Sequence, residues 1–261
     1  MKIIKFRKIS GNKYKLFLDN NESIILYEDV IIKNNLLSTK KIDSELLDDL
    51  MKQNNHFNVY DIALNYISVR MRSIYELRTY LEKKKVSDSL IENTVKKLLY
   101  DGYLNDLKFS KAFVNDKLSI TNYGPLKIKK ELLKYRVDED IISSVIGSIN
   151  QDVVKEKLKV LVNRQVKTKK GSANAVKNKL ITYFVNLGYE KEMIVEELSK
   201  FEFNSDKEKL KKDYEKLYNK YKTKYHKNEL LYFISQKLYL KGYTSDDIKF
   251  IINEKNNQDI S

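Results

Sequence analysis

Apolar and polar residues follow two different patterns in this chain, with the change near residue 59. The runs at 2–9, 14–18 and 23–27 are short and β-rich, and Gly or Asn turns separate them. This pattern predicts a small antiparallel sheet of about three strands. A sheet of that size needs cover to be stable, so we expect neighbouring helices to pack on it.

The polar segments beside this sheet suggest where its domain ends. Helices are expected at about 28–34 and 43–52, where they would supply the cover. The polar run at 54–58 then breaks the pattern. Polar clusters of this kind are typical of loops between elements. We therefore predict an N-terminal β-rich cap with short helices over residues 1–58.

From Val59 onward the apolar residues recur at helical spacing, in four units of similar length. An apolar residue follows the middle helix of each unit, and an acidic or hydroxyl cap comes next. These junction residues are Val86, Val137, Tyr189 and Tyr243, separated by 51, 52 and 54 positions. Fixed periods of this size indicate tandem repeats. We predict three-helix repeats at 59–105, 106–150, 151–205 and 206–261, with first helices starting near 59, 106, 151 and 206.

Tandem units that contact mainly their neighbours form an elongated array rather than a globule. The expected fold is therefore mainly α: three-helix repeats in an elongated curved array, with a small N-terminal antiparallel β element. The periodic apolar stripes would form its core, since each helix must bury one face. Four tyrosines fit core or helix-junction positions: Tyr80, Tyr103, Tyr189 and Tyr243.

The stretch from 63 to 137 carries the most specific motif. Ser73 and Glu76 have the spacing of a capping box, in which each side chain satisfies a backbone N–H of the other residue. Gly102 can adopt the left-handed backbone that ends a helix. Asn105 or Asp106 can then cap the next helix. Caps and turns alone explain most of these residue types.

The order of these motifs resembles the RecX family of proteins that regulate the bacterial recombinase RecA. The matching elements are Ile67-Ser68-x-Arg70-x-Arg72-Ser73-x-x-Glu76-Leu77, Gly102-Tyr103-Leu104-Asn105-Asp106-x-x-Phe109-Ser110 and Gly124-x-x-x-Ile128-x-x-Glu131-Leu132. The similarity is clear over 59–150. The chain departs from the family at Lys85 and Arg136, where Gly is usual, which leaves these two helix ends open.

The resemblance implies a fold of tandem three-helix units and a role in recombination and DNA repair. Such repeats would lie along the groove of the RecA–single-stranded DNA filament and would block or destabilise it. The filament's ATPase, strand-exchange and co-protease activities would then fall. The implied partners are the RecA filament and single-stranded DNA, with double-stranded DNA as a further candidate, and the protein is expected to be a monomer.

Composition narrows the class of protein. The 261 residues contain no Cys, which excludes a disulfide scaffold and any thiolate metal site. No apolar run approaches the length of a transmembrane helix, and the first residues lack the apolar core of a signal peptide. We therefore expect a cytoplasmic protein that does not associate with membranes.

The charge points to a polyanionic partner. The formal net charge is +14, and the excess of basic residues grows toward the C-terminus. Only 6 of the 50 basic residues are Arg, which disfavours base reading by bidentate guanidinium groups. Codon bias in an AT-rich genome is an equally good explanation of the Lys:Arg ratio, although it does not account for the net charge.

Basic side chains on helices are the candidate contacts with nucleic acid or filament. Arg70, Arg72 and Arg78 belong to the family-like motif, and Arg is scarce in this chain. Solvated helix faces are an equally good explanation of the lysine clusters. The other candidate residues are Lys127, Lys129, Lys130, Lys134, Arg136, Lys167, Lys169, Lys170 and Lys177.

An enzymatic function finds no support in the residues. His56 and His226 are the only histidines, and neither has a metal-ligand spacing. The sequence contains no Gly-rich phosphate loop and no defensible nucleophile–base pair. We expect neither cofactor nor metal.

Two other hypotheses remain. A helix-turn-helix-like DNA-binding transcriptional regulator is the first, because three-helix units can mimic such modules. The openings of the second helices, at 73–76 and 124–127, are poorly suited to base reading. The other alternative is a helical-repeat scaffold with no nucleic-acid role.

Overall fold

The computed structural model describes residues 1–258 of the chain. It contains two compact units. The first unit consists of residues 1–111 and 134–141, and the second of residues 112–133 together with the chain from Ile142 onward.

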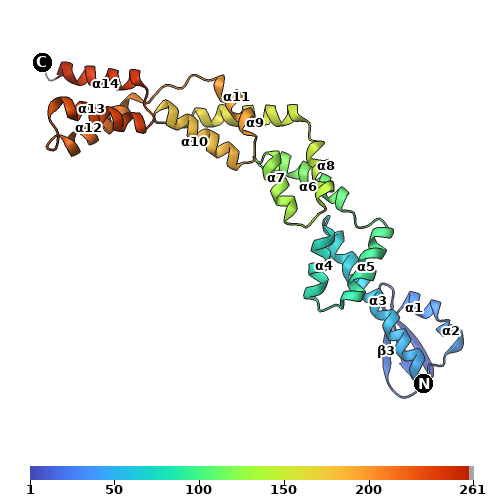
Figure 1. Cartoon of the computed structure of the whole chain (residues 1–261). Helices are drawn as coiled ribbons and strands as arrows, with labels where there is room; N and C mark the ends of the chain where they lie inside the picture. Colours follow the sequence, from blue (N-terminus) through green and yellow to red (C-terminus); the bar gives the residue numbers. More distant parts are fainter. Residues whose placement is uncertain (259–261) are drawn as a thin grey trace. The chain divides into compact units, whose positions relative to one another are not determined.

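The described residues are mainly helical, with one small antiparallel sheet at the N-terminus, which confirms the predicted fold class (Figure 1). The strands are β1 (Ile3–Ser10), β2 (Lys13–Leu18) and β3 (Ser23–Tyr27). The helices are α1 (Glu28–Lys33), α2 (Leu36–Thr39), α3 (Ser44–Ser68), α4 (Ile74–Lys83), α5 (Asp88–Tyr100), α6 (Asp106–Ile120), α7 (Pro125–Leu133), α8 (Glu139–Gly147), α9 (Gln151–Val166), α10 (Ala173–Asn186), α11 (Lys191–Ser199), α12 (Lys207–Tyr221), α13 (Lys227–Leu240) and α14 (Ser245–Gln258).

The sheet has the strand order β1-β2-β3, and both pairings are antiparallel, as predicted. Side chains alternate between its two faces, so Phe6, Leu16 and Ile24 lie side by side on one of them. This inner face forms a core with residues such as Val30 of α1 and Leu50 of α3. The expected helical cover is therefore present.

The predicted break at 54–58 is wrong, because α3 runs through it without interruption. The side chain of Asn54 lies along β3, one of the two edge strands of the sheet. Its Oδ1 accepts from the N–H of Tyr27 (2.9 Å), and its Nδ2 donates to the carbonyl of Ile25 (3.0 Å). Asn58 accepts from the Tyr27 hydroxyl (3.3 Å). Asn54 thus satisfies backbone groups of an edge strand and Asn58 binds a side chain of the same strand, so the polarity of both serves a tertiary contact and not a loop.

The helix that opens the first predicted repeat therefore starts at Ser44 and not near 59. Asp43 caps it, accepting from the N–H of Leu46 at 2.8 Å. The other first helices begin close to the predicted positions, at Asp106, Gln151 and Lys207.

The four middle helices, α4, α7, α10 and α13, are each followed by a left-handed residue. These residues are Lys85, Arg136, Gly188 and Gly242, with φ of 60°, 49°, 88° and 87°. After three of the helices, the N–H of the next residue turns back to a carbonyl in the last turn. Val86 bonds to Leu81 (3.2 Å), Tyr189 to Phe184 (3.1 Å) and Tyr243 to Leu238 (3.2 Å). This geometry ends a helix and directs the next apolar residue inward.

A second regularity links each middle helix to the following one. The residue before α4, α7 or α10 donates to the carbonyl that precedes the next left-handed residue. The three bonds are Ser73 Oγ to Tyr135 (3.3 Å), Gly124 N to Leu187 (2.7 Å) and Ser172 Oγ to Lys241 (2.6 Å). Backbone groups left over at one helix end are thus satisfied by the start of another helix.

The first N–H of two middle helices, α4 and α10, is satisfied in a related way. Ile74 N donates to Asp106 Oδ1 (2.9 Å), and Ala173 N donates to Ser205 Oγ (3.0 Å). The corresponding residue of α7 is Pro125, which has no N–H to satisfy. Pro125 therefore leaves no N–H at the start of α7 that would need an acceptor.

The contact of α7 with α10 brings two backbones together at Gly124 and Gly188. A Cβ on Gly188 would lie 2.2 Å from Lys127 N, and a Cβ on Gly124 would lie 2.5 Å from the carbonyl oxygen of Gly188. Only glycine permits this approach at both positions.

Replacing Gly188 by Ala should lower the free energy of unfolding by about 2–4 kcal/mol, because strain at positive φ adds to the overlap with Lys127. Urea denaturation followed by circular dichroism would measure the loss. Gly147→Ala is the matched control: its Cβ meets nothing within 4 Å, and it lies at the end of α8. Equal stability of the two variants would contradict the close approach.

Replacing Lys85 by Gly should raise the free energy of unfolding by about 0.5–1 kcal/mol. Glycine removes the strain that a side chain causes at positive φ, which stabilises the folded state. Glycine also raises the entropy of the unfolded chain, which offsets part of this gain. Lys84→Gly is the control: Lys84 has φ of −82°, so this substitution should destabilise the protein. Thermal denaturation of both variants tests the difference in sign.

Candidate nucleic-acid interface

The candidate basic residues fall into three groups: the arginines around α4, the basic side chains of α7 and its C-terminal end, and the lysines between α9 and α10. The surrounding contacts decide how much of each group's charge is available to a ligand.

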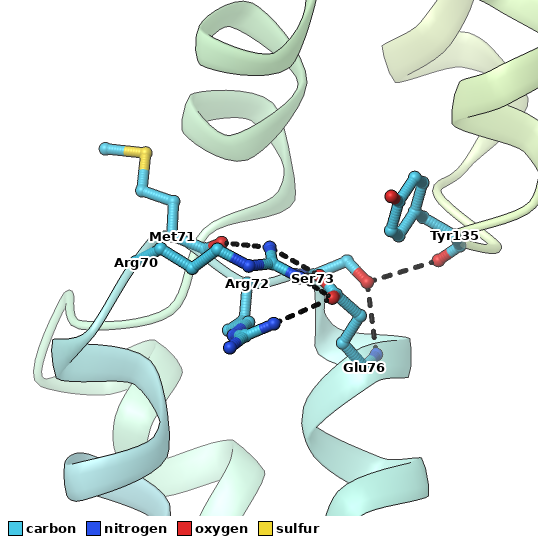
Figure 2. Close-up of polar contacts among 6 residues, drawn as sticks. All are labelled: Arg70, Met71, Arg72, Ser73, Glu76 and Tyr135. Atoms are coloured by element: carbon cyan, nitrogen blue, oxygen red, sulfur yellow. Dashed lines mark hydrogen bonds and ion pairs between the residues drawn. The ribbon is translucent and has the colours of Figure 1, made fainter.

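The start of α4 forms the predicted capping box (Figure 2). Ser73 Oγ accepts from the N–H of Glu76 (3.1 Å), and the Glu76 carboxylate accepts from the N–H of Ser73 (3.1 Å). Ser73 is fully buried, and its hydroxyl also donates to the carbonyl of Tyr135. One serine therefore caps α4 and joins it to the segment after α7.

The same Glu76 carboxylate binds two of the candidate arginines (Figure 2). Arg70 Nη2 lies 2.5 Å and Arg72 Nη1 lies 3.3 Å from Glu76 Oε1. The Arg72 side chain is only 17% exposed, whereas that of Arg70 is 48% exposed. Arg70 is thus the member of this pair that a ligand can reach.

Arg72 also lies against aromatic rings. Its guanidinium carbon is 4.4 Å from the ring centre of Tyr66, and Tyr66 stacks on Tyr80 with centroids 3.9 Å apart. Cations are attracted to aromatic faces, and the guanidinium plane stacks well on them. Arg72 therefore has a packing role that its charge alone does not reveal.

Arg78 forms a bidentate ion pair with Glu92 of α5. This pair connects α4 and α5, and both side chains are about 40% exposed. An external anion would have to share or displace Glu92 to reach the guanidinium.

The basic side chains of α7 have different surroundings. Lys127 is half-buried, with its Nζ 5.7 Å from the ring centre of Tyr123. Lys129 and Lys130 are exposed, and no ion pair is found for either among the described residues. Lys134 is exposed and has an interaction within the protein. Arg136 is exposed and lies 4.7 Å over the ring of Tyr75.

The lysines between α9 and α10 lie beside a basic cavity. Lys167, Lys169 and Lys170 are exposed, and Lys177 is half-buried. Lys170 lines a cavity of about 260 Å³ together with Lys179, Lys209 and Lys241. One of these charges is compensated, since Lys241 Nζ lies 2.6 Å from Asp213 Oδ1.

Lys209 and Lys241 were not among the candidates from the sequence. They come from α12 and from the end of α13, far from Lys170 along the chain. The repeat register was the only signal that could have placed them near the start of α10.

Gly102, Tyr103 and Asn105, from the second element of the family-like motif, line a second cavity of about 250 Å³. Gly102 has the expected left-handed backbone (φ 75°), and Asn105 caps α6 by accepting from the N–H of Lys108 (2.9 Å). Arg72, Lys108 and Tyr103 contribute to the walls. Tyr103 is 64% exposed and lies between α5 and α6, so it occupies a helix junction and not the core, the two kinds of position that the sequence allowed. Tyr189 and Tyr243 are buried.

Asp106 is used differently from its expected role as a cap. Its carboxylate accepts from the N–H of Ile74 at the start of α4. Burial raises the pKa of Asp106, the hydrogen bond from Ile74 acts in the opposite direction, and the nearby Glu76 carboxylate adds to the increase.

The described part of the chain contains neither a candidate metal site nor a candidate membrane-spanning helix. No group of three or more His, Cys, Asp or Glu side chains is placed to hold a metal ion there. No described helix is both long enough and apolar enough to span a bilayer.

Comparison with known proteins identifies two domains in the sequence. A family model described as RecX, first three-helix domain, matches residues 60–98, and one described as RecX, second three-helix domain, matches residues 105–146. The regulatory protein RecX of Halalkalibacterium halodurans is 32% identical over 96% of this chain and 98% of its own length. That of Streptococcus uberis is 28% identical over 96% of this chain and 99% of its own length.

Two solved structures share the fold. A crystal structure of regulatory protein RecX superposes with a TM-score of 0.64 at 18% identity and covers 74% of this chain and 96% of its own. The structure of RecX from Lactobacillus salivarius gives a TM-score of 0.54 at 21% identity over 57% of this chain and 97% of its own.

The Asp106 carboxylate predicts a pH dependence of stability. Its pKa is raised in the folded protein, so the folded state binds a proton more tightly than the unfolded chain does. The ionised Asp106 therefore lowers the free energy of unfolding at pH values above its raised pKa. This loss is recovered as the pH falls from the raised pKa toward the ordinary pKa of an Asp carboxyl. Relative to Asp106→Asn, the wild type should become more stable between pH 7 and pH 4.

Urea denaturation at several pH values measures this difference. Asp106→Ala serves as the comparison, because it leaves the N–H of Ile74 without its acceptor and should be about 1–2 kcal/mol less stable than Asp106→Asn at every pH. A wild type that loses stability relative to Asp106→Asn on acidification would show that the sign is wrong.

Proposed function

The chain belongs to the RecX family, and from this we propose that it is a non-enzymatic regulator of homologous recombination that binds the RecA–single-stranded DNA filament and inhibits its activities. The observation that carries the proposal is the similarity to regulatory RecX proteins over nearly the whole chain. ATPase, strand exchange and co-protease activity would all fall, because each of them needs an intact filament.

The contacts within the protein support different roles for the exposed lysines and for the arginines. Lys129 and Lys130 are exposed, and the lysines before α10 are exposed as well. Arg72 and Arg78 are instead held by Glu76 and Glu92. The exposed lysines are therefore the better candidates for contact with phosphate or with acidic groups of the filament, and the arginines for shaping the surface around them.

We further propose that four three-helix repeats, at 59–105, 106–150, 151–205 and 206–261, act together on one filament. The first of them begins within α3, which itself starts at Ser44. Several modest contacts on one chain bind with a high effective concentration, so no single contact has to be strong. A monomer in the cytoplasm is sufficient for this mechanism.

The helix-turn-helix alternative is less well supported. A recognition helix uses the residues at its N-terminus to contact base edges in the major groove. The starts of α4, α7 and α10 are instead hydrogen-bonded to the ends of other helices, through Ser73, Gly124 and Ser172. These three helix starts are therefore not free to enter a groove.

The test is the single-stranded-DNA-dependent ATPase of the cognate RecA, titrated with this protein. Inhibition at fewer than one protein per RecA is the expected result. Lys129→Glu/Lys130→Glu should raise the concentration for half-inhibition about tenfold, because it replaces attraction by repulsion at an exposed face.

Lys212→Glu/Lys216→Glu on α12 is the matched control, with the same change in charge at two exposed positions outside the proposed contacts. It should inhibit nearly as well as the wild type. If equimolar protein leaves the ATPase unchanged in salt low enough to keep filaments intact, regulation of RecA by this chain is excluded.

A further inference from the structure

The N-terminal sheet carries an unusual distribution of charge. Its strands contain five basic residues and no acidic one; the basic residues are Lys5, Arg7, Lys8, Lys13 and Lys15. All eight acidic residues among the first 58 lie outside the strands. The modest net charge of this segment therefore conceals a strongly basic sheet.

Strand register places most of this charge on the outer face. Phe6, Leu16 and Ile24 are neighbours on the face that packs on the helices, so the positions next to them point outward. Arg7 pairs with Lys15, and Lys15 pairs with Ile25. Three cations, Lys5, Arg7 and Lys15, thus share one face of two neighbouring strands.

The pairing of Arg7 with Lys15 is unfavourable for the isolated protein. Like charges directly opposite each other on neighbouring strands destabilise a sheet. Among the described residues, no ion pair is found for Lys5, Arg7 or Lys15. Lys13 differs, since its Nζ lies 3.7 Å from an Asp61 carboxylate oxygen. A polyanionic ligand would relieve the repulsion that the fold leaves in place.

The outer face also presents an aromatic ring among these charges. Phe17 pairs with Lys5 across the strands, and Lys15 Nζ lies 5.4 Å from the centre of its ring. Ile25, on the same face, is 49% exposed. Aromatic rings on a sheet stack unpaired bases, while neighbouring lysines and arginines bind the phosphates. An acidic polypeptide could match the charges but would have no base to place on Phe17.

We propose that the outer face of the β1–β3 sheet binds single-stranded nucleic acid. Lys5, Arg7 and Lys15 contact successive phosphates, and a base stacks on Phe17 once Lys15 has moved from the ring to a phosphate. Binding by this face does not require RecA, so it can fail while inhibition of the RecA ATPase holds, and the reverse is equally distinguishable.

The experiment measures binding of the full-length protein to a fluorescein-labelled oligo-dT by fluorescence anisotropy, without RecA and over a range of salt concentrations. Lys5→Gln/Arg7→Gln/Lys15→Gln should raise Kd at least about tenfold and reduce the slope of log K against log salt by about 2, since each phosphate contact with a single strand contributes about 0.7. The control Lys33→Gln/Lys41→Gln/Lys52→Gln removes the same charge from exposed positions outside the sheet strands and should leave both quantities nearly unchanged.

Equal weakening in the two triple variants would overturn the proposal, because net charge alone would then explain binding. The ATPase titration on the same variants separates this site from the regulation of RecA. A variant that loses oligo-dT binding but still inhibits RecA supports a separate site on the sheet.

The stacking contact has its own readout. The wild type should bind oligo-dT more tightly than an abasic strand of equal length, and Phe17→Leu, which keeps an apolar side chain, should abolish that preference. Circular dichroism verifies that the variant is folded. Equal binding of both strands by the wild type would overturn the role of Phe17, and equally strong competition by polyglutamate would assign the face to an acidic polypeptide instead.

Discussion

At the end of a middle helix, one backbone carbonyl has no acceptor role within its own helix and instead accepts a hydrogen bond from the start of another middle helix. In three places this carbonyl precedes a left-handed residue and accepts a hydrogen bond from the residue in front of the preceding middle helix: Ser73, Gly124 or Ser172. The left-handed backbone exposes the carbonyl, and it also turns the next apolar residue into the core. Helix termination and the contact between helices therefore depend on the same few atoms.

The residues of the family motif make contacts beyond their own helix ends. Ser73 and Glu76 form a capping box, but Ser73 also reaches Tyr135, and Glu76 also holds Arg70 and Arg72. Asp106 leaves the capping of its own helix to Asn105 and satisfies α4 instead. The motif residues thus mainly build the junction, and the charge left for a partner lies on exposed lysines nearby.

The tolerance of Lys85 and Arg136 at positive φ has a local explanation. Glycine is required at 188 because a Cβ would overlap the backbone of Lys127. Arg136 instead directs its side chain over the ring of Tyr75, at the start of α4. At Lys85 the departure from glycine therefore costs some backbone strain but keeps the hydrogen bond from Val86 N to Leu81 O that ends α4.

The sequence by itself determined the helical class, the β-rich N-terminus, the capping box and the register of the junction residues, because periodicity, caps and turns are local properties. Only the tertiary structure decided that residues 54–58 continue a helix, since their amides meet an edge strand that is distant along the chain. It likewise brought Lys209 and Lys241 to Lys170, and separated the basic face of the sheet from the acidic residues around it. The net charge of a segment does not show this separation of basic from acidic side chains, because it sums over residues that folding places on different surfaces.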